Sequence, residues 1–244
     1  MTSRLKKHAA TNVLVAAATL GAGLAHAVGV PGQGTWEVTL QPRELDGNVT
    51  NGPEAFYDTA LNITWLRNAN VGGLMDWSTA VTWANTLVVG GVGGWRLPTM
   101  VDTGLPGCGF SLSGDPDCGY NVPTASSEMA HLYYVTLGNL AYCPPGDATC
   151  AGGPQTGWGL SNTGGFQDVQ SYNYWFGTAY APDPFGAWFF DQFGGGQSYG
   201  TQANVFYAMA VRAGDVAAIP EPQTYALTLM GVGALMLAVR RRTR

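Results

Sequence analysis

The sequence predicts an α+β domain, in which a small twisted antiparallel sheet is combined with two helices and long disulfide-tied loops. Two stretches with helical periodicity come first and short aromatic strands come later, an order typical of α+β folds rather than of alternating βαβ units. The 35 glycines and 14 prolines favour many turns, and four cysteines favour covalent ties between loops.

The strands are predicted from alternating apolar and polar residues bounded by turn residues. In the first half of the chain they are Thr35–Leu40, Phe56–Asp58 and Ile63–Arg67, of which the last two form a pair around a turn. In the second half they are Tyr174–Tyr180, Ala187–Phe193 and Tyr207–Gly214, separated by glycines.

Two helices are predicted. Asp76 is a good N-cap for the first, and an apolar stripe runs from Trp77 to Val88 before Gly90-Gly91 ends the helix. The second helix spans Ser126–Leu137, where Ser126 or Ser127 is the cap and Gly138 closes the last turn.

Two arginines lie inside apolar strands. In the segment GGWRLPT (Gly93–Thr99), Trp95 and Leu97 point one way and Arg96 the other. Arg212 lies in the last predicted strand. An unpaired charge in either place would be too costly, so each arginine is expected to form a structural ion pair with an acidic residue.

The first 27 residues have the pattern of a secretory signal peptide. A basic start is followed by an apolar run from Ala9 to Leu24, and Ala25 and Ala27 form the small-x-small pattern that signal peptidase cleaves. The alternative is a plain membrane helix, which the polar residues in the run and the cleavage pattern disfavour. The mature, exported chain would begin near Val28.

The C-terminal end combines a proline-bearing motif, an apolar segment and a basic cluster. Pro220-Glu221-Pro222 comes first, residues 223–239 are predicted as a short transmembrane helix, and Arg240, Arg241 and Arg242 follow. By the positive-inside rule the arginines stay cytoplasmic, so the body is exported while the tail is held in the inner membrane. A permanent single-span anchor is the alternative to a removable tail.

The order of these three parts resembles the PEP-CTERM sorting signal of Gram-negative bacteria, over residues 216–244. The resemblance implies recognition by an exosortase, cleavage near Pro220-Glu221-Pro222, and release or attachment at the cell exterior. Proteins with this signal tend to accompany exopolysaccharide and biofilm-matrix production. We therefore expect a protein of the cell surface or extracellular matrix.

Between the two ends the chain is strongly acidic. Residues 28–219 hold four arginines, no lysine and 15 acidic residues, a formal net charge of −11. Such a surface repels phosphate and sulfate groups, which excludes nucleic acid as a partner. Neutral glycans, cationic partners and divalent cations remain compatible with it.

Four cysteines in an exported domain predict disulfides. They allow three connectivities, of which Cys108–Cys118 with Cys143–Cys150 is favoured because each pair closes one local loop. A metal site built from all four thiolates is the alternative. The wide spacings and the oxidising compartment disfavour it.

The body carries a second resemblance, in the order of its motifs. WSTAVTWAN (Trp77–Asn85) and GGWRLPT precede SEMAHLYYVTLGN (Ser127–Asn139), and YWFGTAY, AWFFDQF and AVRAGD follow. This order is similar to the bacterial domain of unknown function related to the C-terminal domain of Lcl collagen-like adhesins. The resemblance covers residues 56–215, after an N-terminal extension with the first strand at 28–55. It implies a C-type-lectin-like fold and, by analogy with some members, glycan binding.

Aromatic residues are the candidates for glycan contact, because flat sugar faces stack on rings. They are Trp158, Tyr172, Tyr174, Trp175, Tyr180 and Trp188, although a sheet core would also need some of these rings. Calcium is the inorganic ion that the body could bind, with Asp115, Asp117 and Asn121 as its oxygen ligands. The alternative for that loop is a solvated acidic surface.

No catalytic set is predicted. His131, the single histidine of the exported body, lies among helix-stripe residues, and no nucleophile motif or phosphate-binding loop occurs. Asp183 and Asp191 flank a hairpin and would be the pair for a glycosidase. We therefore expect a non-enzymatic protein associated with exopolysaccharide. An enzyme acting on exopolysaccharide and a purely structural matrix protein are the alternatives.

Overall fold

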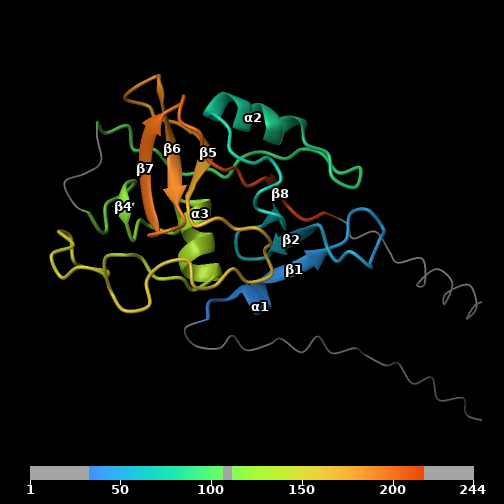
Figure 1. Cartoon of the computed structure of the whole chain (residues 1–244), viewed down its shortest axis with the longest axis horizontal. Helices are drawn as coiled ribbons and strands as arrows, with labels where there is room; N and C mark the ends of the chain where they lie inside the picture. The colour runs from blue at the N-terminus through green and yellow to red at the C-terminus, as the bar shows by residue number, and fades with distance from the viewer. Residues whose placement is uncertain (1–32, 107–111, 217–244) are drawn as a thin grey trace, which may run out of the picture.

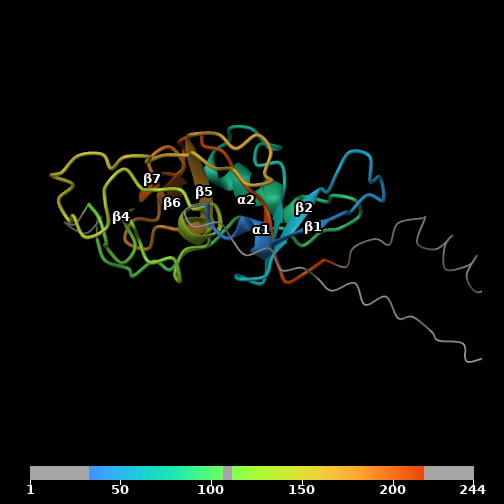
Figure 2. The same cartoon turned by 90° about the horizontal axis from the view of Figure 1, so that it is seen from below.

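The computed structural model describes residues 33–106 and 112–216, which form two antiparallel four-stranded sheets with few helices. In Figures 1 and 2 the two sheets lie toward opposite ends of the molecule. The antiparallel architecture agrees with the prediction, but the prediction of a single sheet was wrong because the strands form two sheets. The early strands pair with one another and with the C-terminal strand, while the aromatic strands form a sheet of their own.

The first sheet has the order β1-β2-β3-β8. Its strands are β1 (Leu40–Arg43), β2 (Ala55–Asp58), β3 (Ile63–Leu66) and β8 (Val211–Ala213). The predicted strand pair around a turn is confirmed as β2 and β3, whose register pairs Asp58 with Ile63. Because β8 pairs with β3, the two ends of the described chain meet in one sheet.

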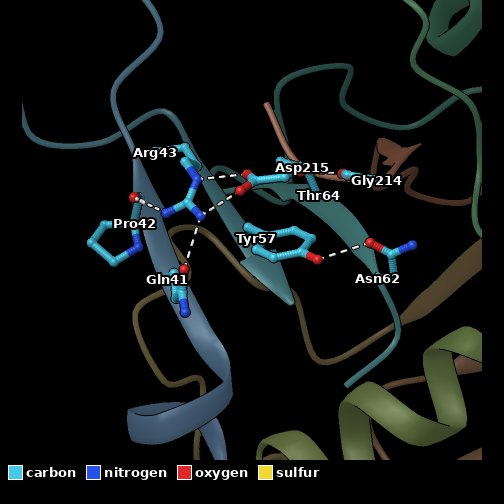
Figure 3. Close-up of polar contacts among 8 residues, drawn as sticks. All are labelled: Gln41, Pro42, Arg43, Tyr57, Asn62, Thr64, Gly214 and Asp215. Atoms are coloured by element: carbon cyan, nitrogen blue, oxygen red, sulfur yellow. Dashed lines mark hydrogen bonds and ion pairs between the residues drawn. The ribbon is translucent and has the colours of Figure 1, made fainter. Parts of the chain in front are cut away.

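A cluster of polar contacts holds the end of β8 against β1 (Figure 3). The guanidinium of Arg43 donates from Nε and Nη2 to the two carboxylate oxygens of Asp215, at 2.6 and 2.7 Å, and lies 5.3 Å from the ring centroid of Tyr57. The hydroxyl of Thr64 donates to the carbonyl of Gly214 at 2.8 Å. The residues directly after β8 are therefore held by side chains of β1 and β3.

The segment predicted as a strand at Thr35–Leu40 is instead a single helical turn, α1 (Trp36–Thr39), followed by β1. The amide of Thr35 donates to the carbonyl of Thr136 at 2.9 Å, which fastens the segment to the end of the second helical region. The contact is so close that a Cβ on Gly34 would lie 2.4 Å from the Thr136 carbonyl oxygen. This long-range contact overrides the alternating pattern.

The second sheet has the order β4-β7-β6-β5. Its strands are β4 (Gly119–Tyr120), β5 (Asn173–Ala179), β6 (Gly186–Asp191) and β7 (Gly196–Thr201). The predicted strands at 174–180 and 187–193 are confirmed as β5 and β6. Strand β7, with the sequence GQSYGT, was missed because it lacks apolar alternation. The predicted strand at 207–214 shortens to β8.

Of the two predicted helices, α2 (Trp77–Thr86) has Asp76 as its N-cap, as predicted, but ends before the expected Val88. Val89 and Val92 form a tight backbone pair there. The second helical region is α3 (Glu128–Ala130) continued by the π-helix η1 (His131–Thr136). Ser127, rather than Ser126, is its cap.

The core is built mainly from aromatic side chains. Trp65, Trp95, Trp175 and Trp188 are all almost fully buried. The largest cluster includes residues from both sheets and from the region of α3 and η1, and a second cluster lies between α2 and the other face of β5 and β6. The aromatic-rich strands predicted from the sequence therefore supply most of the core.

The predicted ion pair of Arg96 is confirmed, because its guanidinium forms two hydrogen bonds of 2.7 and 2.8 Å with the carboxylate of Glu128 at the start of α3. Among the described residues Arg212 has no ion pair, and its Nε is buried without a hydrogen-bond partner. The described residues therefore supply no acidic partner for Arg212, in contrast to the prediction. Strand β8 carries this side chain on the half-buried position opposite Thr64.

The predicted disulfide Cys143–Cys150 is confirmed, with 5.3 Å between the two Cα atoms. Cys118 is also disulfide-bonded, and Cys108 lies outside the described residues. The predictions of a signal peptide at 1–27 and of a transmembrane helix at 223–239 also concern residues outside that range. Within residues 33–106 and 112–216, no helix combines the length and apolar character that crossing a bilayer requires.

We expect Ser127→Ala to destabilise the domain by about 1–3 kcal/mol. The buried hydroxyl of Ser127 accepts from the amide of Ala130 at 3.2 Å and donates to Oε1 of Gln197 at 2.7 Å, so its loss removes the cap and takes this donor from the buried Oε1 of Gln197. The measurement is urea unfolding. In the control Ser126→Ala, only a hydrogen bond to the carbonyl of Pro123 is lost, and a change below about 1 kcal/mol is expected. Equal effects would contradict the assignment of the cap.

Candidate functional site

A pocket of about 360 Å³ lies on the second sheet, on the face opposite the main core. We call it the sheet pocket. All four strands contribute to its lining, which consists of Leu112, Cys118, Gly119, Tyr120, Asn173, Phe189, Asp191, Gly196, Gln197 and Ser198. The lining combines aromatic rings with amide, hydroxyl and carboxylate groups, the mixture that small-molecule sites use.

The register of the sheet brings these residues together. Asn173 on β5 lies opposite Asp191 on β6. Asp191 also lies opposite Gly196 on β7, and Gly196 lies opposite Tyr120 on β4. The four residues form one row across the sheet, and side chains two positions further along a strand share its face. Phe189 is therefore on the same face, directly beside the row.

Gly196 keeps the floor of the sheet pocket open. A Cβ at this position would lie 3.3 Å from Cε1 of the Tyr120 ring, tighter than an ordinary van der Waals contact. The ring of Tyr120 therefore covers the glycine backbone and forms one wall of the pocket. Any larger residue at position 196 would displace the ring of Tyr120.

Asp191 supplies the charge in the sheet pocket. Its Oδ1 accepts from the amide of Phe193 at 2.8 Å and its Oδ2 from the amide of Gly194 at 3.1 Å, in the turn between β6 and β7. Burial raises the pKa of Asp191 above its usual value, although these two hydrogen bonds act in the opposite direction. The carboxylate is held in place by the backbone, without a cationic partner in the described part of the chain.

A chain of ring contacts leads away from the sheet pocket. The ring centroids of Tyr120 and Tyr142 lie 5.9 Å apart. The ring of Trp158 lies 4.8 Å from that of Tyr142 and 5.0 Å from that of Phe193. We call these four residues the aromatic ridge. The side chain of Phe193 is 55% exposed and Trp158 is half-buried, so the ridge reaches solvent. The loops around residues 140–160, drawn yellow in Figures 1 and 2, lie at this end of the molecule beside β4.

The structure separates the six aromatic residues predicted to contact glycans. Tyr174, Trp175, Tyr180 and Trp188 are buried in the core, so their ring faces do not reach the surface. Tyr172 is 47% exposed but belongs to another group of rings, with Phe206 and Tyr207. Of the six predicted residues, only Trp158 belongs to the aromatic ridge. Tyr120 and Asn173 were not predicted, because nothing local in the sequence indicates their place in one row.

The residues predicted to bind calcium stabilise their own loop. Oδ2 of Asp117 accepts from the amide and hydroxyl of Thr103, and the side-chain amide of Asn121 donates to Ser113 Oγ and to the carbonyl of Cys143, both at 2.8 Å. Asp115 and Asp117 are buried. These contacts give the loop a structural role, and calcium binding there stays a prediction.

A different carboxylate cluster was not predicted. Glu44, Asp46 and Glu54 place carboxylate oxygens within 4.8 Å of one another at the loop between β1 and β2. The pKa of Glu44 is raised to about 7. Burial is the largest cause, and hydrogen bonds with Asp46 and Glu54 come second. A protonated Glu44 can therefore donate to its neighbours, which offsets the repulsion among the three acids.

The structure does not bring together the candidate catalytic residues. Asp183 lies in the turn before β6 and Asp191 at the end of that strand. The five strand steps from Gly186 to Asp191 span about 16 Å, beyond the separation of roughly 5–10 Å that glycosidases need. His131 is half-buried, burial lowers its pKa, and its Nδ1 lies 3.3 Å from the Thr136 hydroxyl. These contacts hold the side chain within the helix.

Comparison with known proteins identifies the C-terminal end of the chain. Residues 218–242 match the PEP-CTERM protein-sorting motif, which confirms the predicted sorting signal at this end of the chain. This motif indicates an exported protein that is processed by exosortase. No curated protein and no solved structure is significantly similar to the chain. The relation to Lcl adhesins and the C-type-lectin-like fold therefore stay predictions.

The raised pKa of Glu44 predicts a pH-dependent stability. Between the unfolded pKa of 4.5 and the folded pKa of about 7, the folded state holds a proton that the unfolded state releases. The free energy of unfolding should therefore fall as the pH rises through this window. Glu44→Gln should flatten this slope in urea titrations at pH 4.5 to 7.5, while the exposed control Glu37→Gln should retain it. An unchanged slope in Glu44→Gln would contradict the shared proton.

Proposed function

We propose that this chain is an exported, exosortase-sorted protein of the cell surface or extracellular matrix of a Gram-negative bacterium, and that its folded domain binds glycans without catalysing a reaction. The PEP-CTERM motif at residues 218–242 supports the export and sorting. Signal peptidase and exosortase would be its partners during export. The extracellular polysaccharide of a biofilm would be its partner afterwards.

The sheet pocket is the observation that supports glycan binding. A volume of about 360 Å³ is at the small end of ligand sites and suits one sugar ring. The Tyr120 ring offers an apolar face for stacking, while Asn173, Asp191 and Ser198 offer hydrogen-bonding groups for hydroxyls. The aromatic ridge extends from Tyr120 and would contact further sugar units of a polymer. No cofactor takes part in this role.

We expect the protein recovered outside the cell to lack its C-terminal tail. Intact mass should give a species that begins near Val28 and ends near Pro220, lighter by about four mass units before reduction than after it because two disulfides are present. Replacing Pro220, Glu221 and Pro222 with alanine should leave the full-length chain in the membrane.

The matched control replaces Gln223 and Thr224 with alanine, next to the motif, and should be exported normally. A wild-type chain that retains its C-terminal arginines and is found only in membranes would contradict sorting and favour a permanent anchor.

Glycan binding should depend on the ring of Tyr120. On an array of bacterial polysaccharides, Tyr120→Ala should weaken binding about tenfold, equivalent to ~1.4 kcal/mol, because the stacking surface is lost. Tyr120→Phe keeps the ring and should bind almost normally. The control is Phe185→Ala, which removes a 76% exposed ring at the opposite end of β6. No saturable binding by the wild-type protein would favour a purely structural matrix role instead.

A further inference from the structure

The sheet pocket contains one negative charge and no positive charge. Its lining includes Asp191 but no lysine, arginine or histidine. The four arginines of the exported domain are all engaged or buried elsewhere. Arg43 and Arg96 are in ion pairs, Arg67 donates to the carbonyls of Gly165 and Pro53, and Arg212 lies within β8. Nothing on the described domain therefore neutralises this pocket.

The carboxylate and the ring of Tyr120 converge on one place. A Cβ built on Gly194 would lie 3.2 Å from Oδ2 of Asp191 and 3.3 Å from Cε1 of Tyr120. The two backbone amides bonded to Asp191 use one lone pair of each oxygen, so further acceptor capacity remains. A carboxylate beside an aromatic ring is a suitable environment for an ammonium group, through an ion pair and a cation–π contact.

We propose that the sheet pocket binds the free amino group of a deacetylated amino sugar, with the carboxylate of Asp191 as its counter-ion and the ring of Tyr120 against its apolar face. This inference rests on the proposed glycan-binding function and specifies its ligand. A neutral acetamido group would gain neither the ion pair nor the cation–π contact.

Two further properties of the domain agree with a cationic glycan. Burial raises the pKa of Asp191, and a bound ammonium would offset the cost of this poorly solvated charge. The net charge of −11 over residues 28–219 also attracts a polycation at long range. Binding should therefore weaken with added salt and also at acidic pH, where Asp191 becomes protonated.

The test is calorimetric titration of the exported, processed protein with three probes: a glucosamine oligomer, the N-acetylglucosamine oligomer of equal length, and putrescine. The free-amine oligomer should bind at least tenfold more tightly than the acetylated one. Asp191→Asn should abolish this preference, whereas Asp183→Asn, which removes an exposed carboxylate at the far end of β6, should preserve it. Thermal unfolding of each variant checks that the turn after β6 is intact.

The outcomes separate the two proposals. Equal or tighter binding of the acetylated oligomer would overturn amine recognition and leave glycan binding in place. If putrescine binds as tightly as the glucosamine oligomer, the pocket recognises an ammonium group without the sugar, which would overturn the assignment of an amino sugar. If no probe binds, amine recognition fails, and the polysaccharide array then decides whether glycan binding fails with it. The comparison of ligands on the wild-type protein holds even if Asp191→Asn unfolds.

Discussion

The pairing of β8 with β3 is the constraint on which the rest of the structure depends. Strand β8 has neighbours on both sides, because Val211 exchanges two backbone hydrogen bonds of 2.7 and 2.8 Å with Arg96 while β3 occupies its other edge. Arg96 in turn binds Glu128 at the start of α3. One short strand thus links the first sheet, the WRLPT segment and the helical region that packs on the core.

The end of this strand lies close in the chain to the start of the sorting motif. Val216 is buried and Asp215 is bound by Arg43, while the sorting motif begins at residue 218. The contacts that hold β8 are made by residues up to Val216. The removal of the tail within the motif would therefore leave them in place. The residues that hold β8 and the residues of the sorting motif are therefore adjacent but separate in the sequence.

The second sheet has one face in the main core and lines the sheet pocket with the other. Tyr174, Trp188 and Phe190 point into the main core, whereas Asp191 and Asn173, adjacent in sequence to two of these rings, lie on the opposite face. The two-residue period of a strand makes this division possible. Glycine at position 196 keeps the floor clear for the Tyr120 wall. Most of the aromatic side chains of this segment are therefore buried, and the sheet pocket is lined by a few residues that alternate with the buried rings.

Features that depend on neighbouring residues could be predicted from the sequence alone. The cap at Asp76, the pairing of β2 with β3, the Cys143–Cys150 disulfide and the sorting motif are all local, because each involves residues close together in the chain. The tertiary structure alone decided the position of β7, the helical turn at Trp36, the burial of Trp175 and Trp188, and the meeting of Tyr120 with Asp191. These features depend on strand register and on contacts between distant segments, and no local pattern of residue types encodes such contacts.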